Sequence, residues 1–140
     1  MEYKKIDDKY FLRLDQNEKI VENLKDFCLK NDIKTGVVTG IGAIKSVTLG
    51  CFNPETKAYF EKTISGYMEI TSLMGNVSRK DNLPYIHLHA NVSTENLNVI
   101  GGHLVEAIIS ATCEICILQA NVEINRKFSD EIGLNIYDFN

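Results

Sequence analysis

The three histidines of this chain lie close together in the sequence, as His87, His89 and His103. The spacing of His87 and His89 places both imidazole rings on one face of a strand, because side chains along a strand alternate between its two faces. Imidazole nitrogen is a common ligand of zinc and related metals. The glycines Gly101 and Gly102 permit a tight turn that returns His103 towards the preceding strand. The sequence therefore predicts a metal site made by these three side chains.

The chemistry of such a site has two interpretations. Three neutral imidazoles leave a fourth position for water or substrate, which is typical of a catalytic zinc, but the same ligands also suit a structural metal. Catalysis would need an added acid or base, and the candidate carboxylates are those of Glu69, Glu106 and Glu114. The alternative is that the histidines and these carboxylates face solvent on a half-buried sheet. Imidazole ligands also leave the metal open among zinc, nickel, copper and cobalt.

Length and composition indicate one globular domain. The chain has 140 residues, of which 44% are hydrophobic and 24% charged, and no apolar run approaches the ~18 residues that a membrane span needs. The first residues lack the apolar stretch of a signal peptide, so we expect a cytoplasmic protein without membrane association. The net charge is −4, and the basic residues form no stripe of the kind that binds phosphate backbones. Assembly of several copies would still gather the doublet Arg79 and Lys80 into one patch.

The four cysteines are Cys28, Cys51, Cys113 and Cys116, and in a reducing compartment we expect all of them to be free thiols. Cys113 and Cys116 match the C-x-x-C pattern. They lie in a segment that is typical of a strand, where positions three apart face opposite sides of the sheet. We therefore expect neither a redox pair nor a zinc pair at these two positions.

One amphipathic helix is predicted near the N-terminus, after a strand over residues 10–14. Asp15, with Glu18 three residues later, has the pattern of a helix N-cap. Apolar residues then recur at helical spacing until the helix ends near residues 31–32, and these residues are Ile20, Val21, Leu24, Phe27 and Cys28. This apolar face is expected to cover a sheet.

The remainder of the chain predicts strands. Two hairpins are expected over residues 46–64 and 67–93, and a long strand, or two strands broken by a bend, over residues 106–124. A helical turn over residues 104–107 is the alternative at the start of that last segment. The expected fold is α+β, a single domain over residues 1–140 with a mostly antiparallel β-sheet wrapped with one main amphipathic helix.

Four segments, taken together and in this order, resemble the plant and prokaryote conserved (PPC) domain, and they are Gly40-Ile41-Gly42-Ala43, residues 66–76, residues 84–90 and Gly101-Gly102-His103-Leu104. The similarity spans about residues 10–118. It implies an α+β fold in which an antiparallel sheet is wrapped with few helices, and it implies assembly as a homotrimer.

The PPC resemblance also implies functions. Plant members carry the domain after an AT-hook that enters the DNA minor groove, and stand-alone prokaryotic members are described as DNA-binding, so the resemblance implies a DNA-binding or regulatory module. The present chain contains no Arg-Gly-Arg-Pro segment of the AT-hook type. In plant members the glycine-to-asparagine motif contacts partner proteins. The resemblance therefore implies a protein-interaction role for the matching residues Gly66, Tyr67, Met68, Glu69 and Ile70.

The PPC domain is also similar in fold to acetolactate decarboxylase, an enzyme that holds zinc with an H-x-H pair and a later histidine. His87, His89 and His103 match that arrangement, whereas the Arg and Glu which the enzyme uses in decarboxylation have no assigned counterpart here. A cofactor, zinc or another divalent transition metal, is thus implied more directly than a reaction. Two functions remain: a trimeric DNA-binding or regulatory module with a metal site, and a small zinc-dependent enzyme acting on a carbonyl or carboxylate compound.

Overall fold

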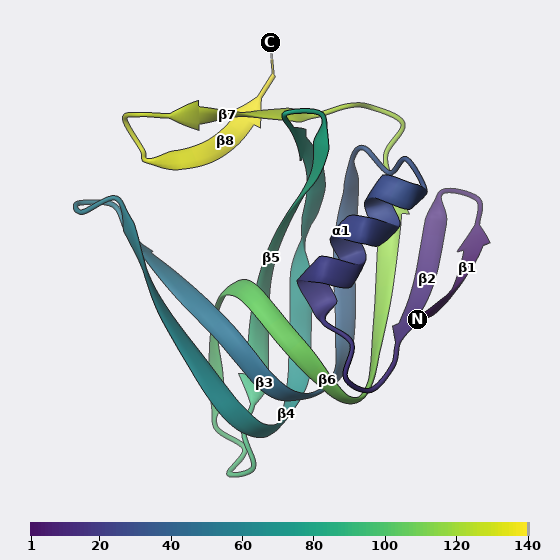
Figure 1. Ribbon diagram of the computed structural model, residues 1–140, viewed down its shortest axis with the longest axis vertical. Coiled ribbons are helices and arrows are strands. Elements are labelled where there is room, and N and C mark those ends of the chain that lie inside the picture. The colour runs from purple at the N-terminus through teal and green to yellow at the C-terminus, as the bar shows by residue number, and fades with distance from the viewer. Residues whose placement is uncertain (140) are drawn as a thin grey trace.

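The computed structural model describes residues 1–139, and within them it contains one short helix and eight strands. Most of the chain is β-structure, as the strand-rich sequence indicates. The elements are β1 (Glu2–Ile6), β2 (Lys9–Leu14), α1 (Ile20–Lys30), β3 (Gly36–Asn53), β4 (Ala58–Lys80), β5 (Leu83–Ser93), β6 (Val99–Gln119), β7 (Asn125–Ser129) and β8 (Leu134–Asp138). Figure 1 shows their arrangement in space.

Strands β3, β4, β5 and β6 form the centre of the fold. Each of them pairs with two of the others in antiparallel fashion, in the order β3, β4, β5, β6 and back to β3, so the four strands close on themselves. The β1–β2 hairpin extends the sheet beside β6. The β7–β8 hairpin joins β4 through a single parallel bridge between Arg79 and Asn125. The sheet is therefore mostly antiparallel with one parallel contact, which confirms the expected fold class.

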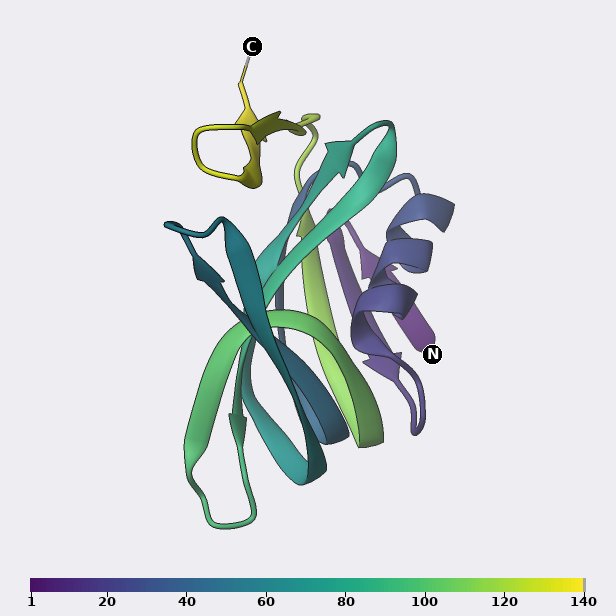
Figure 2. The ribbon, with the colours of Figure 1, turned by 60° about the vertical axis from the view of Figure 1, so that its left-hand side comes forward.

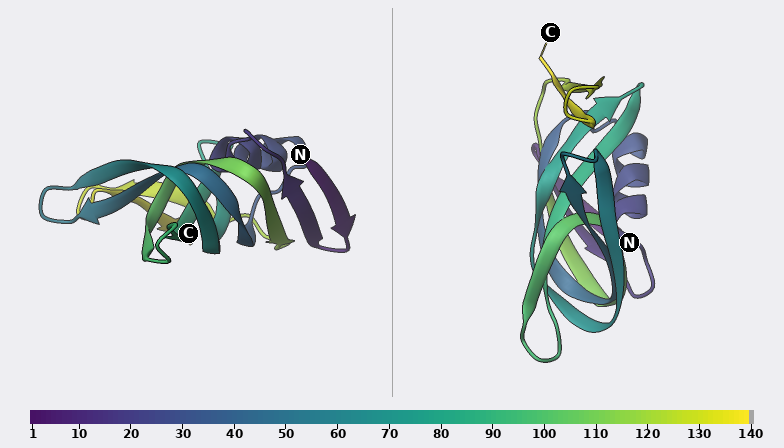
Figure 3. Two further views of the ribbon diagram at one scale, coloured as in Figure 1. Left: turned by 90° about the horizontal axis from the view of Figure 1, so that it is seen from below. Right: turned by 90° about the vertical axis from the view of Figure 1, so that its left-hand side faces the viewer.

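Helix α1 covers one side of the sheet (Figure 3). Its buried side chains are Ile20, Leu24, Phe27 and Cys28, so the amphipathic helix expected from the sequence is confirmed. They meet the inward-facing side chains of the strands, among which Leu73, Leu88 and Ile117 are almost fully buried. Removal of these apolar side chains from water stabilises the fold by roughly 1.5–3 kcal/mol for each large residue. Among the described residues, no helix has the length and apolar character required to cross a membrane.

The predicted N-cap of the helix is wrong. The helix begins at Ile20, with Lys19 at the N-cap position and no hydrogen bond from a capping side chain. Asp15 and Glu18 instead bond to each other, through the Asp15 amide and a Glu18 carboxylate oxygen at 2.7 Å and the Glu18 amide and the Asp15 carbonyl at 3.2 Å. Asp15 and Glu18 therefore close a turn in the connection between β2 and α1, and they do not cap the helix.

A distant carboxylate replaces the local cap. Glu106 of β6 accepts hydrogen bonds from the amide of Val21 at 2.8 Å and from the amide of Glu22 at 3.1 Å. Both amides belong to the first turn, where a helix has no partners of its own for its N–H groups. A negative charge at this end also interacts favourably with the helix dipole. Glu106 thus fixes the start of α1 on the sheet.

The strands differ from the sequence prediction mainly in length. Both predicted hairpins are present, as β3–β4 and β4–β5, and strand β6 runs through residues 104–107 without a helical turn. Strands β3 and β6 start before their predicted ranges, and the pairing of β3 shifts register near Gly42 and Ser46. Such irregularities bend a long strand. The bends allow β3 to remain one continuous strand while it pairs with both β4 and β6 in the closed arrangement.

Candidate metal centre

The structure brings the three histidines together. His87 and His89 lie on one face of β5, and His103 of β6 is paired directly with His89. A ligand atom from each ring lies within 4.8 Å of the other two, and the ring centroids are 5.4 Å apart for His87 and His89, 5.3 Å for His87 and His103, and 5.7 Å for His89 and His103. Three nitrogen atoms at this separation can converge on one ion.

His103 reaches its neighbours without the predicted glycine turn, so that prediction is corrected. Gly101 and Gly102 lie within β6 and pair with β5, whereas the chain reverses direction earlier, over residues 94–98. Glycine is required at these two positions because the adjacent strands approach the backbone closely. A Cβ atom on Gly102 would lie 2.8 Å from the carbonyl oxygen of Gly50 on the adjacent strand β3. The histidines therefore meet because strands β5 and β6 pair in this register.

The surroundings favour the neutral form of the imidazoles. Burial is the largest cause that lowers the pKa of His87, to about 4, and the charge of Arg126 and the other two histidines lower it further. Burial and His89 also lower the pKa of His103, although Glu61 opposes that shift. An imidazole must be unprotonated to bind a metal. These two ligands are therefore in the binding-competent state at neutral pH.

The buried nitrogen of one histidine supports the fit of a metal. Nδ1 of His103 is shielded from solvent and has no hydrogen-bond partner among the described residues. A buried polar atom without a partner is costly, and ring nitrogens of ligating histidines usually have a partner on each side. The unpaired nitrogen therefore fits a site in which a metal ion supplies the missing partner.

The side of the site next to His103 carries a phenol and a carboxylate. The centroid of the Tyr59 ring lies 5.2 Å from that of the His103 imidazole. Glu61 of β4 is paired with Gly50 of β3, which is itself paired with His103 of β6. A Cβ atom on Gly50 would lie 3.0 Å from the Tyr59 ring. Absence of a side chain at this position thus leaves room for Tyr59. Both side chains were missed in the sequence because they precede the histidines by more than twenty-five positions.

The side next to His87 carries a half-buried guanidinium from β7. Arg126 donates through Nε to Ser78 Oγ at 2.7 Å, through Nη2 to Asn76 Oδ1 at 2.9 Å and through Nη1 to the Asn135 carbonyl oxygen at 2.8 Å. Asn76 is the direct cross-strand neighbour of His87. No local pattern in the sequence indicates Arg126, because its partners come from strands far apart in the chain.

Two aromatic rings enclose the same guanidinium. Its central carbon lies 4.6 Å from the centroid of the Tyr85 ring and 4.5 Å from that of Tyr137. Arginine between two aromatic faces is held by cation–π attraction as well as by hydrogen bonds. Arg126 is therefore fixed in place, and it contributes a permanent positive charge beside His87.

The carboxylates nominated from the sequence occupy other places. Glu106 caps α1, as described above. Glu114 lines a groove beside Arg13, and Glu69 lines a hollow beside Tyr67. The carboxylate that acts electrostatically on the histidine cluster is instead that of Glu61.

The segment from Gly66 to Ile70 alternates between core and surface. Met68 and Ile70 are buried in the core, whereas Tyr67 and Glu69 are exposed. A protein-interaction role is thus available to Tyr67 and Glu69 alone among these side chains. Such a role stays a prediction.

The end of the same motif supports the histidines. Gly75 of β4 lies opposite β5, and a Cβ atom at this position would lie 1.9 Å from the carbonyl oxygen of His87. No side chain fits at that distance. Its neighbour Asn76 holds Arg126. This part of the glycine-to-asparagine motif therefore serves the histidine site.

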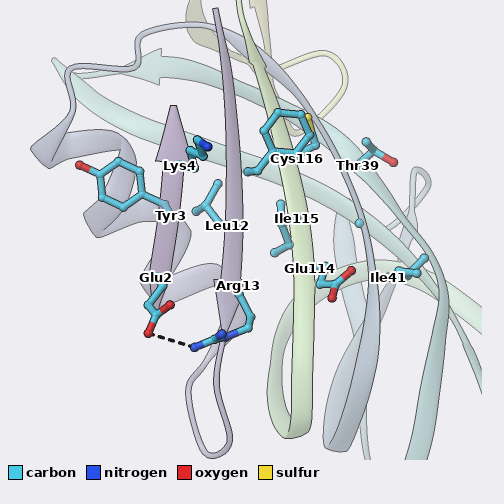
Figure 4. Close-up of a pocket in the computed structure, with 12 residues that line it drawn as sticks. Glu2, Tyr3, Lys4, Leu12, Arg13, Thr39, Ile41, Glu114, Ile115 and Cys116 are labelled. Carbon is cyan, nitrogen blue, oxygen red and sulfur yellow. Dashed lines mark ion pairs between the residues drawn. The ribbon is translucent and has the colours of Figure 1, made fainter. Parts of the chain in front are cut away.

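A groove of about 590 Å³ lies away from the histidines, over β1, β2, β3 and β6 (Figure 4). An ion pair between Glu2 and Arg13, with 3.1 Å between Arg13 Nη2 and Glu2 Oε1, lies at one end. Thr39 and Cys116 line the groove. Cys116 is paired with Thr39, Thr39 with Met74, and Met74 with His89, so these side chains form one cross-strand row. The groove and the histidines therefore share one face of the sheet.

The cysteines are free thiols, as predicted. Cys113 is buried and Cys116 is partly exposed, so the two side chains of the C-x-x-C pattern do point to different sides of β6. Burial raises the pKa of Cys113 and of Cys28 to about 12.

Solved structures of other proteins resemble this chain over nearly its whole length. A candidate DNA-binding protein of Bacteroides thetaiotaomicron is 40% identical, with coverage of 99% of this chain and 96% of that chain and a TM-score of 0.96. A metal-containing protein of Archaeoglobus fulgidus is 33% identical, with coverage of 97% and 94% and a TM-score of 0.87. No curated protein matches the chain significantly.

The expected similarity to acetolactate decarboxylase is confirmed at the level of the fold. The enzyme of Bacillus subtilis is 14% identical, with a TM-score of 0.56, and the match covers 90% of this chain and 58% of that chain. Residues 1–121 match the family model of the Plants and Prokaryotes Conserved (PCC) domain. PCC and PPC are two abbreviations for the same domain. The chain therefore belongs to the Plants and Prokaryotes Conserved domain family.

Proposed function

We propose that this chain is a regulatory PCC-domain module in which His87, His89 and His103 hold a divalent transition metal, with zinc as the first choice. The convergence of three imidazole nitrogens within 4.8 Å carries this proposal. The metal-containing relative from Archaeoglobus fulgidus supports it. Three histidines leave one coordination position for water or a small ligand, so metal occupancy or that ligand would provide the regulatory signal.

Metal analysis of untagged protein tests the proposal. About one equivalent of metal per chain is expected after incubation with zinc and removal of the excess. The double variant His87→Ala/His89→Ala should lose it, whereas the variant Thr39→Ala, altered on the same face of the sheet, should retain it. Metal retained by the double variant, or no metal in the unaltered protein, would contradict the proposed site.

Assembly into a homotrimer is part of the proposal. The face of the sheet that carries His89 exposes large apolar side chains, namely Phe11, Val37, Ile41, Met74 and Leu118. Apolar groups gathered on one face favour association, and further copies of this chain are the partners we infer. A mass of about three times the 15.8 kDa of one chain is expected in light scattering. The variant Ile41→Glu should be smaller, and a monomeric unaltered protein would refute the trimer.

Binding of DNA is proposed because the Bacteroides thetaiotaomicron protein is described by that role. The chain is acidic overall, so the contact would require basic residues gathered by assembly, and Arg79 and Lys80 at the end of β4 are the candidates. Fluorescence anisotropy with duplex DNA should show binding that weakens steeply between low and high salt and that is reduced by Lys80→Ala. Absence of binding at low salt would remove DNA from the proposal.

A small zinc-dependent enzyme acting on a carbonyl or carboxylate compound is the second candidate. It is favoured by the phenol of Tyr59 and the carboxylate of Glu61 beside His103, which supply a proton donor and an acceptor next to an open metal position. Decarboxylation of small 3-oxo acids by zinc-loaded protein would support it. The same rate with the His87→Ala/His89→Ala variant would exclude catalysis by the metal site.

Two further expectations belong to this proposal. Tyr67 and Glu69 are exposed on β4, and we propose them as the contact points for a partner protein. The cytoplasm is the compartment in which we expect the assembly to act.

A further inference from the structure

The C-terminal β7–β8 hairpin lies across the end of the sheet near the tip of the β3–β4 hairpin, as two views of the ribbon show (Figures 1 and 2). It also lies outside the residues that match the family model. Its backbone is joined to the rest of the sheet by one bridge, between Arg79 and Asn125. Side-chain contacts must therefore determine where the hairpin rests.

The root of the hairpin is fastened beside His87. Arg126 reaches from β7 to Asn76, which is paired with His87, and to Ser78, which is paired with Tyr85. Strand β8 approaches the same row, because the Asn135 side chain lies 3.5 Å from the Tyr85 hydroxyl. Tyr85 lies two positions before His87 and so points to the same face.

The tip of the hairpin is fastened on the side of His103. The ammonium of Lys57, in the turn between β3 and β4, donates to the carbonyl oxygen of Asp130 at the hairpin tip. The Lys57 side chain also packs against Gly133, where a Cβ atom would lie 2.8 Å from it. Lys57 is two positions before Tyr59, whose ring contacts His103. The first fastening is therefore next to the strand neighbour of His87, and the second is two positions from the residue that contacts His103.

We propose that the β7–β8 hairpin is a strap over the three-histidine site, and that Arg126 and Lys57 hold it in place and slow the exchange of the bound metal. This inference rests on the proposed metal site. His89 is exposed, so the site stays open beside this residue, and the hairpin restricts it from the side of His87. Local opening of the hairpin would widen the way out for a bound ion and speed its release.

The two fastenings differ in strength. The Lys57 contact is exposed, and a single exposed hydrogen bond contributes little to stability. Arg126 is half-buried, makes three charge-assisted hydrogen bonds and lies between two rings, and such contacts are stronger. Arg126 does not touch the expected ion and is a positioning residue. Its removal should open the strap more than removal of Lys57.

The rate of zinc release to a colorimetric chelator tests the strap in the full-length, zinc-loaded protein. Release should be about tenfold faster in Arg126→Met, the loss expected from one charge-assisted hydrogen bond, and less accelerated in Lys57→Met. The control is Lys25→Met, an exposed lysine change on α1, which should release zinc at the unaltered rate. All four proteins should bind one equivalent at equilibrium.

The outcomes separate the strap from the metal site. Equal release rates in all zinc-binding variants would overturn the strap and leave the metal site intact. Absence of zinc from the unaltered protein would refute the metal site, and the strap with it. Tyr137→Leu removes one ring from the guanidinium and keeps its hydrogen bonds, so it tests the same fastening if Arg126→Met does not fold. Faster release from this variant is expected, and an unchanged rate would overturn the strap.

Discussion

His89 and His103 face each other directly across the antiparallel pairing of β5 and β6, with their ring centroids 5.7 Å apart. The site therefore depends on strand register, because a slip of one residue would turn the side chains of one strand to the other face. Register here is constrained by glycines that permit close approach of backbones, and by the core side chains between them.

Gly75→Ala should destabilise the protein and weaken metal binding together. The added methyl group would collide with the backbone of β5 at the His87 carbonyl, and overpacking of this kind costs about 1–3 kcal/mol. Urea unfolding and zinc titration measure the two effects. Ser65→Ala, an exposed change on the same strand, is the control. Normal zinc affinity in a destabilised Gly75→Ala protein would show that the histidines do not depend on this contact.

Glu106→Ala should lower the free energy of unfolding by about 1 kcal/mol, the usual effect of losing a helix cap. The change leaves the amides of Val21 and Glu22 without their acceptor. Glu106→Gln should cost less, since it keeps an acceptor oxygen and loses only the charge near the helix N-terminus. Chemical denaturation monitors both variants. Unchanged stability accompanied by loss of metal would assign Glu106 to the site instead of the helix.

Metal-free protein should become less stable as the pH falls below 6.5. The pKa of His87 is lowered from 6.5 to about 4 in the folded state, so between these values the unfolded chain binds a proton that the folded chain does not. Protonation then favours unfolding, and this contribution to stability is fully present above pH 6.5. Urea unfolding at pH 7 and pH 4.5 should show a smaller decline for His87→Gln. An equal decline in both proteins would contradict the prediction.

Alkylation should distinguish the cysteines. Cys51 is exposed, whereas Cys28 and Cys113 are buried and have a pKa of about 12. Since the thiolate is the reactive form, iodoacetamide at pH 8 should modify Cys51 first and reach the two buried thiols only after denaturation. Peptide mass spectrometry gives the order. Early modification of Cys113 would indicate that β6 opens more readily than its pairing suggests.

The local patterns in the sequence predicted the elements well. The apolar period of 3.6 residues located α1, and the alternation along residues 85–93 placed His87 and His89 on one face of β5. Those patterns depend only on neighbours in the chain. The start of α1 was predicted wrongly because its cap, Glu106, comes from a strand more than eighty positions away.

The remainder of the site could not be predicted for the same reason. Arg126 and Tyr59 lie beside the histidines through pairings between distant strands, and neither has a local motif that marks it. The glycines before His103 were expected to make a turn, since glycine permits turns and close packing equally well. Only the pairing of β5 with β6 shows which of the two applies.

Calorimetric titration of metal-stripped protein with zinc tests the histidine site most directly. One equivalent should bind per chain in the unaltered protein, and His103→Ala should abolish this binding while leaving the secondary structure unchanged by circular dichroism. Zinc binding with the same stoichiometry and affinity in His103→Ala would contradict the site. So would the absence of binding to the unaltered protein.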